Sequence, residues 1–381
     1  RASEVHAKAF ERVNIPLWEI TDTGEHSVII SAVSESGISD SIRCKYTATD
    51  SYRTYTYSDF KELNPSDVLT ADGAKSMVRI RFTDGERGRI ISGLMNLIWQ
   101  CGGDRVEKKI SKSAAQPIID KYFGEQSDGE DMSFADYINP DGGLAMLPEA
   151  SSDPEVTALA LNFISADKLG SEENVKKYLY SVYGGDNSEN KIAALYGLAL
   201  LGEPVMDEVE KYSLIDGLSV RETAYIGLCF ASYGNTDAAK ACFDKIKAKT
   251  VNYDPYLYVD ESDKDKSIAS TSAALLLACK IGAPEADGYY RYTRENHTSE
   301  TLKVIEELSY LTEKFAKLPE DDAALTYTLW GEEKTVDFKT GENAFVTLSQ
   351  PGLSDLKITS ASGGAGAVMM YQKSISDITD S

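Results

Sequence analysis

The sequence lacks long hydrophobic runs, paired cysteines and clustered histidines. No stretch approaches the roughly 20 apolar residues of a membrane span, and the first residues lack the apolar segment of a signal peptide. Its five cysteines include no Cys-x-x-Cys pair, which excludes a disulfide scaffold and a zinc ribbon. The three histidines, His6, His26 and His297, are scattered, so we expect neither a metal site nor a cofactor built on them.

Basic residues are also scarce. The 39 Lys and Arg residues stand against 61 Asp and Glu residues, which gives a formal net charge of -22. Because such a surface repels phosphate and gains nothing from counterion release, the composition excludes nucleic acid as a partner. With 381 residues, 42% of them hydrophobic, the chain is long enough for two or three globular domains.

Both ends of the chain alternate apolar and polar residues and are rich in β-branched side chains, a pattern typical of strands. At the N-terminal end we predict strands at residues 26–33, 41–48, 52–57 and 76–82. After residue 320 the same strand-like pattern occurs in five short segments separated by Gly-Glu, Thr-Gly and Pro-Gly turns. These C-terminal strands are expected at residues 325–330, 334–338, 344–348, 356–360 and 367–371.

Between residues 86 and 318 the hydrophobic period is that of helices, with about twelve helical stretches. One stretch begins with Asp153 as N-cap and Pro154 at the first helical position. Three others, which we expect to begin at residues 188, 218 and 267, end at glycines. The helical region is therefore several elements long and punctuated by short turns.

Apolar and polar helices alternate along this region. The stretches at 158–164, 193–201, 224–231 and 273–279 are apolar on most sides, whereas 172–184, 237–249 and 285–296 carry a charged face. Helices of the first kind are buried and those of the second kind lie outside. About six such pairs predict a mainly α fold, an α/α toroid of the terpenoid-cyclase-like kind flanked by β-sandwich segments. An open solenoid is the structural alternative.

Several motifs, taken in order, resemble the α2-macroglobulin/complement family, and bacterial α2-macroglobulin-like proteins in particular. The "SD" before the second strand resembles the end of a macroglobulin-type sandwich, and "NPDGG" followed by "DPEVTALAL" resembles a signature of the bacterial toroids. The resemblance covers nearly the whole chain, in residues 24–48, 139–164, 267–278, 297–311, 326–338 and 353–371.

The resemblance implies a domain order. Residues 1–50 would be the end of a macroglobulin-like β domain, and residues 51–85 the first part of a split CUB-like β domain. Residues 86–318 would be the toroid, which in this family is the thioester domain, and residues 319–381 would complete the split domain.

In that family a Cys-x-Glu-Gln motif at a helix start condenses its thiol and glutamine side chain into a reactive thioester. Here the motif should fall at or near Asp104 or Arg105, with Glu107 and Lys108 where the glutamine should stand. Cys101 lies three or four residues too early, so we interpret it as a small residue at a helix junction. The sequence thus predicts a degenerate thioester site.

Two further segments are candidate binding loops. The turn Asp141-Gly142-Gly143 is a candidate for phosphate binding, but such a pair of glycines after Pro-Asp is more often a tight turn. Tyr256 and Tyr258 belong to a tyrosine-rich segment, and tyrosine is enriched at interfaces. Packing of outer helices against loops is the alternative.

We therefore predict a non-catalytic, protease-inhibitor-related module of a secreted, surface or periplasmic protein. Its partners would be proteins, proteases among them, or other domains of a longer chain. The alternative is an α/α-toroid enzyme acting on glycans, which would need two facing carboxylates. Its candidates are Glu125, Asp128, Glu130, Asp131, Asp141 and Asp153.

Overall fold

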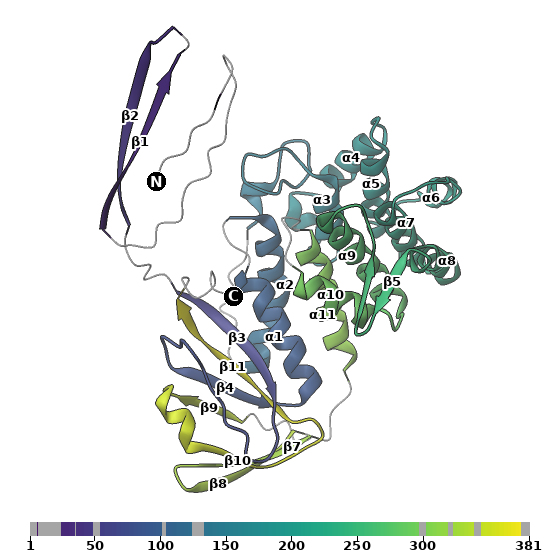
Figure 1. The fold of residues 1–381 in the computed structure, drawn as a ribbon. Coiled ribbons are helices and arrows are strands. Elements are labelled where there is room, and N and C mark those ends of the chain that lie inside the picture. The colour runs from purple at the N-terminus through teal and green to yellow at the C-terminus, as the bar shows by residue number, and fades with distance from the viewer. Residues whose placement is uncertain are drawn as a thin grey trace. The chain divides into compact units, whose positions relative to one another are not determined.

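The computed structural model describes most of the chain. The described residues are 6, 24–34, 36–48, 54–100, 104–123, 133–296, 302–318, 323–338 and 344–374. They fall into two compact units. Arg1–Tyr55 with Lys373–Ser381 is the first unit, and Thr56–Gln372 is the second (Figure 1).

The first unit contains a long β-hairpin. Strand β1 (Gly24–Val33) pairs antiparallel with β2 (Ser39–Ala48) along its full length. The turn between them is closed by the Ser34 amide, which donates to the Ile38 carbonyl at 2.9 Å. Both strands predicted for this part of the chain are confirmed.

The second unit holds two small sheets, of strand order β3-β11-β4-β9 and β10-β7-β8. Strands from before and after the helical region share the first sheet, since β4 lies between β11 and β9. All the strands predicted at these two ends are present, within a few residues of their expected bounds. The bounds are β3 Thr54–Glu62, β4 Val78–Thr83, β7 Ala324–Leu329, β8 Glu332–Asp337, β9 Phe345–Leu348, β10 Leu356–Ser362 and β11 Gly366–Ser374.

The β7–β8 hairpin is closed by a tight two-residue turn. Trp330 and Gly331 both have positive φ, at 53° and 85°, and the register Leu329 to Glu332 leaves only these two residues in the loop. Positive φ at both positions is the signature of a type I′ turn, which favours Asn-Gly. Tryptophan is an unusual choice at the first position, where its side chain is 73% exposed.

We expect Trp330→Asn to raise the free energy of unfolding by about 0.5–1 kcal/mol, because asparagine adopts positive φ at lower cost and little buried area is lost. Urea unfolding followed by circular dichroism measures the change. Trp330→Phe, which keeps an aromatic side chain in the same conformation, should bring no gain. A loss of stability in Trp330→Asn would show that the indole ring makes a stabilising contact.

Eleven α-helices lie within the described residues, close to the number predicted. None of them is long and apolar enough to cross a membrane. Their bounds are α1 Gly85–Gln100, α2 Val106–Phe123, α3 Pro154–Ala160, α4 Glu172–Tyr183, α5 Ser188–Leu200, α6 Met206–Ser213, α7 Val220–Ser232, α8 Thr236–Lys247, α9 Lys264–Ile281, α10 Ala286–Glu295 and α11 Lys303–Lys317.

The helix ends follow local capping chemistry. Asp153 caps α3, accepting from the backbone amides of Glu155 and Val156 at 2.9 and 3.0 Å, with Pro154 at the first helical position as predicted. The expected start of α9 at residue 267 is wrong. The helix begins three residues earlier because the side chain of Asp263 caps it.

The apolar helices form a row of packed neighbours. Helix α3 packs on α5, α5 on α7, α7 on α9, α9 on α11, and α11 in turn on α3. Helices α4, α6, α8 and α10 contact this row through one face each, while α1 and α2 pack on each other and on α11. Most side chains of α7 and α9 are buried, whereas α8 and α10 bury a single stripe. The alternation of buried and outer helices follows the sequence pattern.

The helical region also contains a short hairpin that sequence reasoning treated as a loop. Strand β5 (Thr250–Tyr253) pairs with β6 (Tyr256–Val259), and β6 packs on α9 and α10. Strands of four residues are too short to give a period that stands out from the helices beside them.

Candidate functional site

The junction between α1 and α2 is where the resemblance places a degenerate thioester site. Helix α1 ends at Gln100 and α2 begins at Val106, and Cys101 lies outside the described residues. In the first turn of α2, Glu107 is almost fully buried, and the Arg105 guanidinium donates to its Oε1 at 2.9 Å. The positive end of the helix dipole also favours a carboxylate at this position.

A loop that includes the 3-10 helix Ala135–Tyr137 covers this junction. The Tyr137 hydroxyl donates to the Asp104 carbonyl at 3.1 Å, and the Val106 amide donates to the Met146 carbonyl at 3.0 Å. The Lys109 ammonium lies 5.1 Å from the centre of the Tyr137 ring. Burial, with smaller contributions from Asp104 and other nearby carboxylates, raises the pKa of the Tyr137 hydroxyl. The start of α2 is thus held by a neutral phenol and backbone bonds.

Residues 104–108 contain an ion pair but not the two side chains from which a thioester is made. A thioester needs a sulfur atom and a carboxamide, and the side chains from Asp104 to Lys108 supply neither. Lys108 itself is only partly buried. The structure brings Arg105 and Glu107 together, while Asp104 contributes its backbone carbonyl.

The turn at Asp141–Gly143 is pressed against α4. Gly142 has φ +93°, and a Cβ atom there would lie 2.3 Å from the carbonyl oxygen of Asn174. The Asp141 carboxylate accepts from the Gly143 amide at 2.9 Å and from the Ser152 hydroxyl at 2.7 Å. The polar groups of the turn are therefore engaged within the loop.

Tyr256 and Tyr258 lie on strand β6 and contact a different helix, α10. The ring of Tyr258 stacks on Tyr292 with 4.8 Å between centroids, and the Tyr256 hydroxyl donates to Glu295. These tyrosines pack the hairpin onto an outer helix, whereas the Asp141–Gly143 turn contacts α4. The contacts of the two candidate binding loops thus run to separate helices.

A largely buried polar cluster, which sequence reasoning missed, joins the row of apolar helices. Arg221 of α7 donates from Nε to Glu155 of α3 at 2.8 Å and from a terminal nitrogen to the Tyr225 hydroxyl at 2.9 Å. Its guanidinium also lies 3.1 Å from a carboxylate oxygen of Glu306 of α11. The second Glu306 oxygen accepts from Ser272 of α9. We call these five side chains the Arg221 cluster.

An aromatic pair extends the cluster to α5. The Tyr225 ring stacks on Tyr196 at 5.7 Å, and the Tyr196 hydroxyl donates to Asn162, just past the end of α3, at 2.9 Å. Burial raises the pKa of Glu306, which is 0% exposed, and Arg221 offsets part of that rise. Burial opposes the charge of Arg221, but Glu306 and its neighbours outweigh it, so the pKa of the guanidinium lies above its ordinary value.

The alternative of a glycan-cleaving enzyme requires carboxylates that face an open groove. In the Arg221 cluster, Glu155 and Glu306 face an arginine, and Glu306 has no exposed surface. Asp141 and Asp153 hold a turn and a helix cap, and residues 125–131 lie outside the described residues. Within the described residues there is also no group of three side chains that could hold a metal ion.

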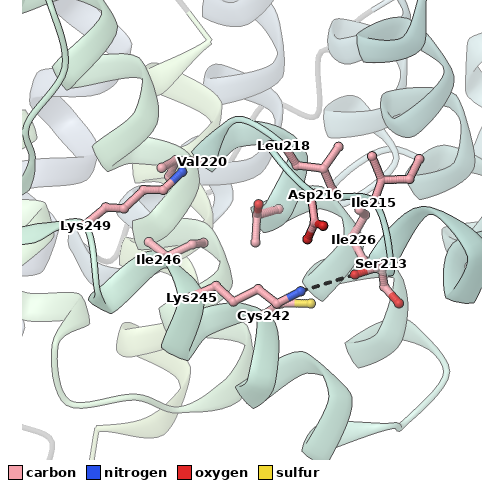
Figure 2. A pocket seen from close by; sticks show the side chains of 12 residues that line it. Ser213, Ile215, Asp216, Leu218, Val220, Ile226, Cys242, Lys245, Ile246 and Lys249 are labelled. Atoms are coloured by element: carbon pink, nitrogen blue, oxygen red, sulfur yellow. Dashed lines mark hydrogen bonds between the residues drawn. The ribbon is translucent and has the colours of Figure 1, made fainter.

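A recess of about 350 Å³ opens between α7, α8 and the loop that precedes α7 (Figure 2). Lys245 reaches along it and donates to the Ser213 carbonyl at 3.2 Å, while Ile226 and Ile246 supply apolar lining. Cys242 also lines the recess, but burial raises the pKa of its thiol. Since the thiolate is the nucleophile, burial makes Cys242 less reactive than an exposed cysteine.

No family model matches this sequence, and no curated protein matches it. Solved structures do. The Escherichia coli alpha-2-macroglobulin structure that runs from domain MG7 to the C-terminus has a TM-score of 0.52 and 13% identity, over 93% of this chain and 63% of that chain. Salmonella alpha-2-macroglobulin reacted with methylamine has a TM-score of 0.54 and 12% identity, over 93% of this chain and 26% of that chain.

At this identity the similarity shows the fold. The chain has the fold of the C-terminal part of bacterial alpha-2-macroglobulins, as the resemblance predicted, and it spans less than two thirds of the length of these structures.

Proposed function

We propose that this chain is a non-catalytic, protein-binding module related to the protease-inhibiting alpha-2-macroglobulins, working outside the cytoplasm. The observation that carries the proposal is the similarity over 93% of the chain to the C-terminal part of the Escherichia coli protein. The module's partners are proteins, proteases among them, or other domains of a longer chain.

We also propose that the helical region is a closed α/α toroid. An open solenoid would leave the first and last apolar helices far apart, yet α11 packs on α3. The Arg221 cluster supports closure as well, because Arg221 bonds to Glu155 of α3 and lies within ion-pair distance of Glu306 of α11. One arginine thus bridges the two ends of the row.

The domain order proposed is 1–50, 51–85, 86–318 and 319–381. The mixing of β3 and β4 with β9 and β11 in one sheet supports a β domain split by the helical region. The β1–β2 hairpin supports a macroglobulin-like first domain, because one of its faces carries exposed apolar residues, Ile30 and Ile42 among them. A two-stranded hairpin is only marginally stable alone in water, so further strands would cover that face.

The module would bind proteins without a thioester. If so, the intact mass of the native chain should equal the mass of its sequence, and methylamine should leave it unchanged. Formation of a thioester would instead release one ammonia, because the thiol displaces the carboxamide nitrogen, and would lower the mass accordingly. Methylamine would then add to the acyl group, free the thiol and raise the mass. Mass spectrometry before and after methylamine treatment measures both quantities.

A Cys101→Ser variant is the matched control, since a thioester through Cys101 could not form in it. A native mass short by one ammonia, with the deficit gone in the variant, would overturn the proposed loss of covalent capture. It would leave the proposed module and its fold in place.

Protein binding is tested against the glycan alternative with two assays. The chain should co-elute in size-exclusion chromatography with at least one serine protease of a panel such as trypsin and elastase, and the complex should dissociate in SDS. Release of reducing sugar from a panel of polysaccharides should stay at the level of the buffer. Sugar release without co-elution would favour the enzyme.

A further inference from the structure

The recess between α7, α8 and the loop of residues 214–219 is bordered by exposed apolar side chains (Figure 2). Leu214 is 83% exposed and Ile215 is 48% exposed, and both lie in this loop, which joins α6 to α7. Ile215 and Leu218 also line the recess itself. Apolar side chains that gather on one exposed loop, instead of standing singly, mark a surface that contacts another molecule.

The floor of the recess is apolar and belongs to the core of the helical region. Val220 and Ile226 of α7 and Ile246 of α8 form it, and each of them is almost fully buried. Because these side chains are packed on the helices behind them, the floor is formed before anything binds. The volume of about 350 Å³ is at the low end of the range of ligand pockets, which suits one or two apolar side chains better than a large cofactor.

The uncharged polar groups of the lining are already engaged within the protein. The Thr223 hydroxyl donates to the Ser219 carbonyl at 2.8 Å, and the Ser213 hydroxyl donates to the Glu210 carbonyl at 2.7 Å. The charged side chains therefore decide which polar group can enter beside an apolar one.

Two ammonium groups and one carboxylate line the recess. Lys245 extends along it from α8 and donates to the Ser213 carbonyl at 3.2 Å, a neutral acceptor that leaves the charge uncompensated (Figure 2). In the part of the chain that the structure describes, no ion pair includes Lys245, Lys249 or Asp216. The lining thus has a surplus of one positive charge in a chain whose formal net charge is -22.

We propose that the recess and its loop bind an exposed segment of a partner protein that carries a large apolar side chain beside a carboxylate. The apolar side chain covers Ile215 and Leu218, and the carboxylate pairs with Lys249 and Lys245. An apolar centre with a charged rim is the usual anatomy of a protein interface. This inference rests on the proposed protein-binding function and gives that function a surface.

Fluorescence anisotropy of labelled peptides with the full chain tests the proposal. The probe has a central leucine–phenylalanine pair flanked by aspartates. One control peptide has lysines in place of the aspartates, and the other has serines in place of the apolar pair. The aspartate peptide should bind about tenfold more tightly than either control. Because the net charge of -22 attracts the lysine peptide and repels the aspartate peptide at long range, this preference would report the local lysines.

Variants of the recess locate the contact. Lys249→Gln and Ile215→Ser should each weaken binding of the aspartate peptide about fivefold, whereas Asp216→Asn should strengthen it by a similar factor. Lys240→Gln is the matched control and should change nothing, because Lys240 is an exposed lysine of the same helix that does not line the recess. Lys249 is exposed, so its variant should keep the fold even if Ile215→Ser does not.

No binding of the aspartate peptide, equal or tighter binding of the lysine peptide, or an unchanged affinity in Lys249→Gln would overturn the proposal. A parent dimer that Ile215→Ser converts to a monomer in light scattering would assign the loop to a second copy of this chain, and tighter binding of octanoate than of the peptide would assign the recess to a small amphipathic acid. Either result would also overturn it. Co-elution with a protease without binding of the aspartate peptide would reject this surface and leave the proposed function in place.

Discussion

Arg221→Met is expected to lower the free energy of unfolding by about 3 to 5 kcal/mol, the range for removing one partner of a buried ion pair. The methionine fills the volume of the arginine stem but leaves Glu306 buried without a compensating charge. It also removes the bond to Glu155 that connects α7 to α3. Urea unfolding followed by far-UV circular dichroism at pH 7 measures the change.

Arg89→Met is the matched control. Arg89 forms an ion pair with Glu62 at 2.6 Å, but both side chains are more than half exposed. Exposed pairs contribute about 0–1 kcal/mol, so this variant should unfold almost as the parent does. If Arg221→Met costs no more than Arg89→Met, the Arg221 cluster does not hold the helices together.

A double-mutant cycle with Glu306→Gln separates the ion pair from its parts. Removing both partners leaves no buried unpaired charge, so Arg221→Met with Glu306→Gln should be less destabilising than the sum of the single variants. An additive result would mean that the two side chains act independently, in conflict with their 3.1 Å separation.

The cost of Arg221→Met should also depend on pH. Burial raises the pKa of Glu306 in the folded protein, and loss of Arg221 would raise it further. A carboxyl whose folded pKa is raised contributes stability that is complete below its unfolded pKa and is lost as pH rises through the folded pKa. The difference between parent and variant should therefore be smaller at pH 5 than at pH 8, and Glu306→Gln should abolish that dependence.

Much of the fold could be predicted from the sequence because its signals are local. Strand texture, helix period and caps act over a few residues, so the Asp153 cap and the paired strands at both ends follow from the sequence itself. The start of α9 was misjudged because Asp263 caps one turn before the apolar run begins. The β5–β6 hairpin was missed because its strands are shorter than the window in which a period can be recognised.

The Arg221 cluster and the Arg105–Glu107 pair were less predictable because their contacts do not follow from short sequence patterns. Arg221, Glu155 and Glu306 lie on three different helices, and only the packing of α3, α7 and α11 brings them together. Arg105 and Glu107 are two residues apart, a spacing that does not bring side chains together within a helix. They pair because Arg105 precedes the first turn of α2.

Gly142→Ala is expected to lower the free energy of unfolding by about 2–4 kcal/mol. Alanine pays roughly 1–2 kcal/mol for a left-handed backbone, and overpacking adds to it. At Gly142 the new methyl would meet the Asn174 carbonyl oxygen at 2.3 Å, and a backbone atom of a helix cannot move aside cheaply. Thermal and urea unfolding of the variant measure the loss.

Gly234→Ala isolates the conformational part of that cost. Gly234 has φ +77°, similar to the +93° of Gly142, but a Cβ there would meet nothing within 4 Å. Its alanine variant should therefore lose only about 1–2 kcal/mol. Equal losses in the two variants would mean that the Asp141–Gly143 turn is not pressed against α4 and is free to bind a ligand. A larger loss in Gly142→Ala would support the tight turn, because a loop seated on a helix has little room for a phosphate.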